Sequence, residues 1–130
     1  MKLKNQQIVD FVNTDFTQKK LPIRMKHAIA MNMASVSAAV KVYSDQRKEL
    51  VDKFAKRDES GELFINENGN YEFEGENVKG WNEAMEELLG SDVEVSVTSF
   101  PYSVLEKCDG PDFDDLSLPE VSAIRFMISG

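Results

Sequence analysis

The chain contains very few of the cysteine and histidine residues on which many catalytic and metal sites depend. Its 130 residues include one cysteine and one histidine. The single Cys108 excludes an internal disulfide bond and is typical of a protein that stays in a reducing cytosol. Zinc sites usually take four ligands, mostly cysteine and histidine, so one residue of each kind is too few. The sequence therefore predicts neither a disulfide framework nor a zinc centre.

Long apolar runs are absent as well. No stretch approaches the roughly 20 apolar residues that a membrane-spanning helix requires. The opening residues, MKLKNQQIVDFVN, begin with charge but contain no continuous apolar segment, which is unlike a secretory signal. We therefore expect a cytoplasmic protein that does not contact a membrane.

Basic residues are scarce in the second part of the chain. Residues 58–130 contain three Lys and Arg against eighteen Asp and Glu, a net charge of −15, whereas residues 1–57 contain twelve against five, a net of +7. Together they give the total of −8, and the sequence pI is about 4.7. Nucleic-acid-binding domains usually have a pI above about 9, so we expect no direct nucleic-acid contact. Because unpaired charge is costly to bury, most of it must lie on the surface, where it favours a basic partner.

Glycine and proline are missing from a long stretch that follows Pro22. Seven apolar residues recur there at alternating spacings of four and three, with one interruption: Ile29, Met33, Val36, Val40, Tyr43, Leu50 and Phe54. This pattern predicts one helix over about residues 22–57, roughly 50 Å long. Such a helix must protrude or pair with another helix, from the same chain or a second copy. For a second copy, Ile29, Val36 and Tyr43 are the candidate self-association seam, and the small residues 34–39 would allow close approach.

Shorter elements flank this spine. Asn68-Gly69 lies between the apolar runs 63–65 and 71–73, which is a strong hairpin signal. Alternating valines over 93–97 predict a half-buried strand that would join the hairpin as its third strand. Further helices are predicted over residues 3–16, 77–89, 102–108 and 118–128. The fold expected is one α+β domain over 1–130: a basic helical half, 1–57, and an acidic α+β half, 58–130, with a small three-stranded antiparallel sheet.

No residue pattern indicates catalysis. His27 has no glycine-rich turn or nucleophile beside it, so packing or surface exposure explains it best. Cys108 precedes an acidic loop, which would raise the pKa of its thiol rather than lower it. The aspartates of that loop, residues 109–115, lack the spacing of a calcium loop. We therefore predict no catalytic residue, no metal site and no cofactor.

The acidic surface is the remaining candidate for function. We expect the binding residues to be the hairpin acids Glu62, Glu67, Glu72, Glu74 and Glu76, with Tyr71 as an aromatic anchor. Negative charge at this density can imitate a nucleic-acid backbone and occupy a basic groove on a partner protein. The alternative interpretation is that the acids only keep a small domain soluble.

Four segments carry a resemblance to known proteins: MKLKNQQIVDFVN, LPIRMKHAIAMNM, KRDESGELF and LSLPEVSAIRFMI. In these the chain resembles small proteins encoded by phages and prophages of Gram-positive bacteria. The resemblance implies an accessory, non-enzymatic role in the cytoplasm of a bacterial host. Such proteins include inhibitors of host defence, among them acidic anti-CRISPR proteins, and also virion components. The sequence thus leaves two hypotheses: an inhibitor that blocks a basic nucleic-acid-binding surface of a host protein, or a phage structural or assembly component that associates through its long helix.

Overall fold

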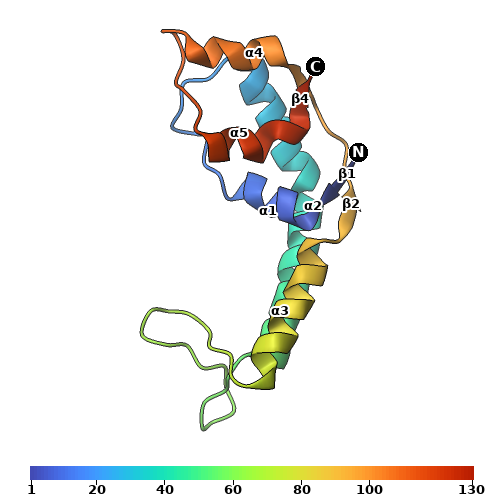
Figure 1. Ribbon diagram of the computed structural model, residues 1–130, viewed down its shortest axis with the longest axis vertical. Coiled ribbons are helices and arrows are strands. Elements are labelled where there is room, and N and C mark those ends of the chain that lie inside the picture. Colours follow the sequence, from blue (N-terminus) through green and yellow to red (C-terminus); the bar gives the residue numbers. More distant parts are fainter.

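The computed structural model describes all 130 residues and consists of two parts, a body and an arm (Figure 1). The body contains residues 1–40 and 91–130, and the arm, residues 41–90, projects from it. Of the 21 buried residues in the chain, only Val51 and Ala55 belong to the arm. The body therefore holds almost the whole hydrophobic core.

The spine of both parts is one helix, α2, which extends over Ile23–Phe54 and confirms the predicted long helix. It starts directly after Pro22, and it ends where Ala55 becomes extended. Its first half lies in the body and buries Met25, Ala28, Ile29, Asn32 and Val36. Its second half leaves the body and forms one side of the arm.

The core is made where α2 meets the short N- and C-terminal helices. Helix α1, Asn5–Val12, packs on α2 and on α5, Leu118–Ile124. Phe11 is fully buried, and its ring meets that of Phe126 edge to face, with 5.3 Å between centroids. The buried Asn32 side chain bonds the backbone of Thr98 twice: its Oδ1 accepts from the amide at 2.7 Å and its Nδ2 donates to the carbonyl at 2.9 Å. One polar pair therefore joins the spine to the segment that crosses it.

The strands form two sheets of two strands each, so the predicted three-stranded sheet is wrong. Strand β1, Lys2–Lys4, pairs antiparallel with β2, Asp92–Glu94. Strand β3, Phe100–Pro101, pairs parallel with β4, Ile128–Ser129. The hairpin region makes only two isolated bridges, Arg57 to Leu63 and Ile65 to Tyr71. Helix α3, Glu76–Leu89, explains the error: its 14 residues carry the chain about 21 Å from the hairpin back to the body before β2 begins.

Several predicted helices are shorter than expected. The segment 3–16 is divided between β1 and α1, which ends at Val12. The segment 102–108 becomes α4, Tyr102–Glu106, followed by a 3₁₀ turn, η1, over Lys107–Asp109. The last segment is α5, then a second 3₁₀ turn, η2, Arg125–Met127, and β4. The last turn of an isolated short helix is easily replaced by a tighter turn, which periodicity alone does not reveal.

The partner of the long helix is α3 of the same chain, which packs beside it to form the arm (Figure 1). The apolar seam predicted for self-association faces inward instead. Ile29 and Val36 are 8% and 1% exposed and belong to the core, and Tyr43 is half-buried. In this fold Ile29 and Val36 cannot contact a second copy.

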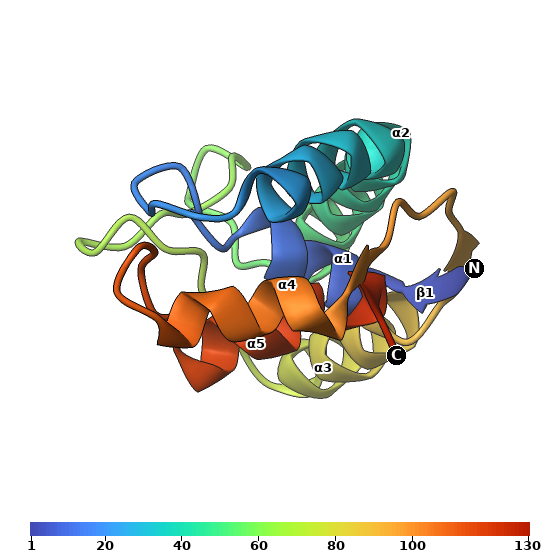
Figure 2. The same ribbon diagram turned by 90° about the horizontal axis from the view of Figure 1, so that it is seen from above.

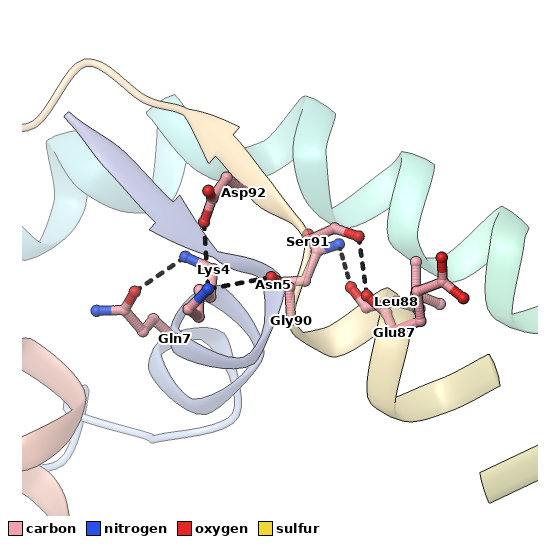
Figure 3. A network of polar contacts seen from close by, with 8 residues as sticks. All are labelled: Lys4, Asn5, Gln7, Glu87, Leu88, Gly90, Ser91 and Asp92. Atoms are coloured by element: carbon pink, nitrogen blue, oxygen red, sulfur yellow. Dashed lines mark hydrogen bonds and ion pairs between the residues drawn. The ribbon is translucent and has the colours of Figure 1, made fainter. Parts of the chain in front are cut away.

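A polar network fastens the arm to the body (Figure 3). The buried Asn5 donates from Nδ2 to the carbonyl of Leu88 at 2.9 Å and from its amide to the carbonyl of Ser91 at 3.0 Å. Lys4 Nζ donates to the carbonyl of Gly90 at 3.2 Å. The accepting carbonyls lie at the end of α3 and just beyond it, where the regular hydrogen bonds of the helix stop. The start of the chain therefore holds the end of the arm in place.

Candidate functional site

The segment between α2 and α3 lies at the end of the arm that is farthest from the body (Figure 1). Its residues 58–76, here called the acidic lobe, contain seven Asp and Glu and no Lys or Arg. No residue between Ala55 and Val95 is buried. The lobe consequently exposes its acids without contributing to the core.

Two tight turns shape the lobe. In the first, the Asp58 carboxylate accepts hydrogen bonds from Ser60 Oγ at 2.6 Å and from the amides of Ser60 and Glu62 at 2.9 and 3.1 Å. The hydroxyl bond is the largest cause that lowers the pKa of Asp58 below its ordinary value. In the second, Asn66 Oδ1 accepts from two backbone amides, and Gly69 supplies a φ of 79°. Asp58 therefore serves the local fold.

The lobe is anchored to the rest of the arm by Lys56, by one aromatic stack and by Arg57, whose guanidinium donates to the carbonyls of Gly61 and Asp52, each at 3.0 Å. Lys56 Nζ pairs with Glu74 at 3.0 Å and lies 5.0 Å from the centre of the Phe64 ring. The bond to Glu74 is the largest cause that raises the pKa of Lys56. Phe73 stacks on Trp81 of α3 with 4.5 Å between ring centroids. These contacts orient the lobe relative to the arm and leave its acidic edge in solvent.

The residues predicted for partner binding do gather in this lobe, but they differ in their surroundings. Glu62, Glu67 and Glu76 are exposed and make no ion pair. Glu72 is half-buried, and Glu74 already pairs with Lys56. The first three are accordingly the acids most available to a partner.

Tyr71 has a neighbour that the sequence argument missed. It is 38% exposed and forms the isolated bridge with Ile65, which is 55% exposed. The two residues lie opposite each other and are more exposed than the other apolar residues of the lobe, Leu63, Phe64 and Phe73, which are half-buried. The sequence could have identified Ile65 as a candidate binding residue because it lies opposite Tyr71 in the predicted hairpin. A β-branched residue in a predicted strand is, however, usually expected to pack rather than to be exposed.

The acidic surface continues along α3, beside the second half of α2, where residues 41–54 contain four Lys and Arg against three Asp and Glu. Glu83 pairs with Lys79 of its own helix at 3.8 Å, and no ion pair joins α2 to α3. Instead, the guanidinium of Arg47 on α2 lies 5.6 Å from the centre of the Trp81 ring. Four pairs do join the two halves of the chain: the N-terminal amine with Glu94, Lys4 with Asp92, Lys19 with Glu120, and Lys56 with Glu74. The charges of the two halves are therefore neutralised only in part.

A hollow lies in the body, between the end of α1, the loop 13–21 and α2. Its volume is about 610 Å³, and its apolar lining includes Val12, Phe16, Leu21 and Met33. The polar groups at its rim are mostly engaged, since Asp15 accepts from the amide and hydroxyl of Thr17. These bonds lower the pKa of Asp15, the hydroxyl bond being the larger cause. No cluster of reactive groups faces this hollow.

The residues considered for chemistry lie apart from one another. Cys108 is buried in the core, and burial is the first cause that raises the pKa of its thiol, with Asp109 second. His27 is exposed on α2. In the acidic loop, the carboxylate of Asp114 accepts from the amide of Lys20 at 2.7 Å and so pins the loop 13–21. No group of three or more His, Cys, Asp or Glu residues is arranged to hold a metal ion.

Comparisons of the chain with protein-family models, curated proteins and solved structures find no match. None of the helices combines the length and apolar character needed to cross a bilayer. The function of this chain is therefore inferred from its geometry and charge.

Proposed function

We propose that this protein binds, through its acidic lobe, a basic nucleic-acid-binding surface on another protein and blocks it without catalysis. The partner is a host protein such as a defence nuclease in the bacterial cytoplasm, and the chain acts as an inhibitor of the anti-CRISPR kind. One observation carries the proposal: seven acids and no base occupy residues 58–76, at the far end of an arm and outside the core.

Physical considerations support such a role. A groove that binds nucleic acid is lined by Lys and Arg, and releasing counterions from a polyanion contributes much of its affinity. A compact cluster of carboxylates presents the same sign of charge, and complementary fields speed the encounter. Tyr71 and Ile65, which flank the turn 66–70, add exposed apolar surface next to the acids, and aromatic anchors of this kind are common in binding hot spots.

Solubility alone would require dispersed charge rather than a segregated cluster. The chain already has charges of both signs over its body, where they form pairs such as Lys19 with Glu120 at 3.1 Å. The lobe differs because its acids make only one ion pair, that of Glu74 with Lys56, while Arg57 beside the lobe pairs with Asp52 of α2. An interaction surface accounts for this segregation more directly than solubility does.

The test is affinity capture from nuclease-treated bacterial lysate, eluted with a salt gradient and identified by mass spectrometry. We expect a nucleic-acid-processing protein to elute at moderate salt, and the double variant Glu67→Lys, Glu76→Lys to lose it. The matched control, Glu106→Lys with Asp112→Lys, makes the same change in net charge on exposed residues of the body. Capture that ignores both salt and the lobe variant would refute the proposal.

A further inference from the structure

One side of α2 is not covered by any other element. Figure 2 shows the helix along one edge of the molecule, with the rest of the chain on its other side. Six exposed residues on this side follow spacings of four, three, four, three and four, and are called here the outer seam: Met31, Ser35, Ala38, Val42, Asp45 and Glu49. Met31 and Val42 are 45% and 57% exposed. Alternating spacings of this kind are typical of helices that pack along one another.

A shallow groove accompanies the middle of the outer seam. It has a volume of about 450 Å³ and lies between α2 and the region where α3 leads into β2. One wall consists of Ser35, Ala38 and Val42, and the other includes Leu88 and Val93. Because Ser35 and Ala38 have short side chains, the backbone of another helix can approach α2 closely here.

We propose that a second copy of this chain occupies the groove, with its α2 antiparallel to the first. In the register that places Ser35 of one copy beside Ala38 of the other, Met31 of each copy lies beside Val42 of the other. The arrangement is two-fold symmetric, so every contact is made twice, as in most homodimers. Each methionine, which adapts readily to irregular surfaces, fills the groove of the facing copy.

Charge complementarity at the ends of the helix supports the second copy as the occupant. The same register brings Arg24 of one copy beside Glu49 of the other. Both residues are exposed, and neither has an ion-pair partner in its own chain. A parallel pairing would instead align like charges and put two acidic lobes side by side. The antiparallel pairing sends the two lobes to opposite ends of the dimer and avoids that repulsion.

The test measures the mass of the full chain by sedimentation equilibrium over a range of micromolar concentrations. We expect the mass to rise from 14.7 kDa toward twice that value, and Val42→Glu to weaken dimerisation at least tenfold. Ser37→Glu is the matched control, because it adds the same charge at an exposed position of the same helix outside the seam. A chain that stays monomeric at several hundred micromolar, or a dimer that Val42→Glu leaves intact, would overturn the proposal.

A charge exchange tests the register independently of folding. Arg24→Glu alone and Glu49→Arg alone should each weaken the dimer, and the double variant should restore it. Residues 24 and 49 are about 38 Å apart along one helix, so they cannot compensate each other within a single chain. Failure of the double variant to restore dimerisation, with circular dichroism showing intact helices, would exclude the antiparallel register. The dimer does not depend on what the acidic lobe binds, since Val42→Glu leaves the lobe unchanged.

Discussion

The body and the arm share one helix, yet they are stabilised in different ways. Along its first half α2 buries five residues among the flanking helices, whereas along its second half only Val51 is buried. The arm relies on stacking, on cation–aromatic contacts and on the packing of α3, none of which excludes water completely. The comparison shows that a long helix can be stabilised by burial along one half while its other half stays largely exposed.

This difference has a consequence for function. Residues in the body are constrained by packing, because interiors are dense and deletions leave cavities. The exposed acids Glu62, Glu67 and Glu76 of the lobe have no such constraint, so packing does not determine which residues occupy these positions. Local opening is also expected to be easier in the arm, where few apolar groups are buried.

The largest effect is expected from emptying the core of the body. Phe11→Ala should lower the free energy of unfolding by about 3–5 kcal/mol, because the ring is fully buried against Phe126. The matched change in the arm, Phe73→Ala, removes a half-buried ring and should lower it by about 1 kcal/mol. Urea denaturation of both variants measures this difference. Equal decreases in the free energy of unfolding would mean that packing in the arm stabilises the fold as much as packing in the body.

The next effect concerns the polar pair between α2 and the crossing segment. Asn32→Ala should lower the free energy of unfolding by about 1–3 kcal/mol, since it removes two hydrogen bonds from the part-buried amide and carbonyl of Thr98. Hydrogen exchange provides the second measurement: the Thr98 amide should exchange faster in the variant, while amides of α3 keep their protection. Unchanged exchange at Thr98 would contradict this assignment.

A smaller effect on stability is expected at Gly80, where α3 contacts Phe54 of α2. Its direction distinguishes close packing from helix propensity. Glycine inside an exposed helix usually costs about 1 kcal/mol relative to alanine, so Gly80→Ala would ordinarily stabilise α3. Here a methyl group would lie 2.5 Å from Cε1 of Phe54. We expect Gly80→Ala to lower the melting temperature instead, and Phe54→Leu to relieve the loss in the double variant. A rise in melting temperature for Gly80→Ala would show that Phe54 moves aside to accommodate the added methyl group.

The smallest effect concerns the pH dependence of the body. Ser117 and Glu120 cap α5 reciprocally, and the amide of Ser117 is the first cause that lowers the pKa of Glu120, with Lys19 also contributing. A lowered carboxylate pKa stabilises the fold above the unfolded-state value of about 4.5. That contribution disappears as the pH falls through the lower folded-state value.

The measurement is the free energy of unfolding of Glu120→Gln and of the unaltered chain at pH 7 and pH 3. The variant should be less stable at pH 7, and the difference should shrink at pH 3. Glu86→Gln, on the exposed side of α3, is the control and should match the unaltered chain at both values. A difference that grows on acidification would contradict the assigned direction of the pKa shift.

The sequence predicted two features correctly from neighbouring residues alone. The long helix could be predicted because no glycine or proline interrupts it after Pro22, and the cap at Ser117 because its partner is three residues away. The gathering of the lobe acids also followed from their closeness in sequence. Pairing between distant segments could not be predicted: β1 consists of residues that read as the start of a helix, and it lies beside β2, about ninety residues later.

The heptad spacing of α2 shows which features follow from the sequence and which follow from the tertiary structure. The sequence alone determined that the helix has an apolar seam through Ile29 and Val36, because side chains repeat every 3.6 residues whatever surrounds them. Only the tertiary structure decided that this seam faces the chain's own core, and that the side with Met31 and Val42 remains exposed. The apolar spacing alone does not specify what packs against the seam through Ile29 and Val36. That depends on which segments α1, α3 and α5 bring to it.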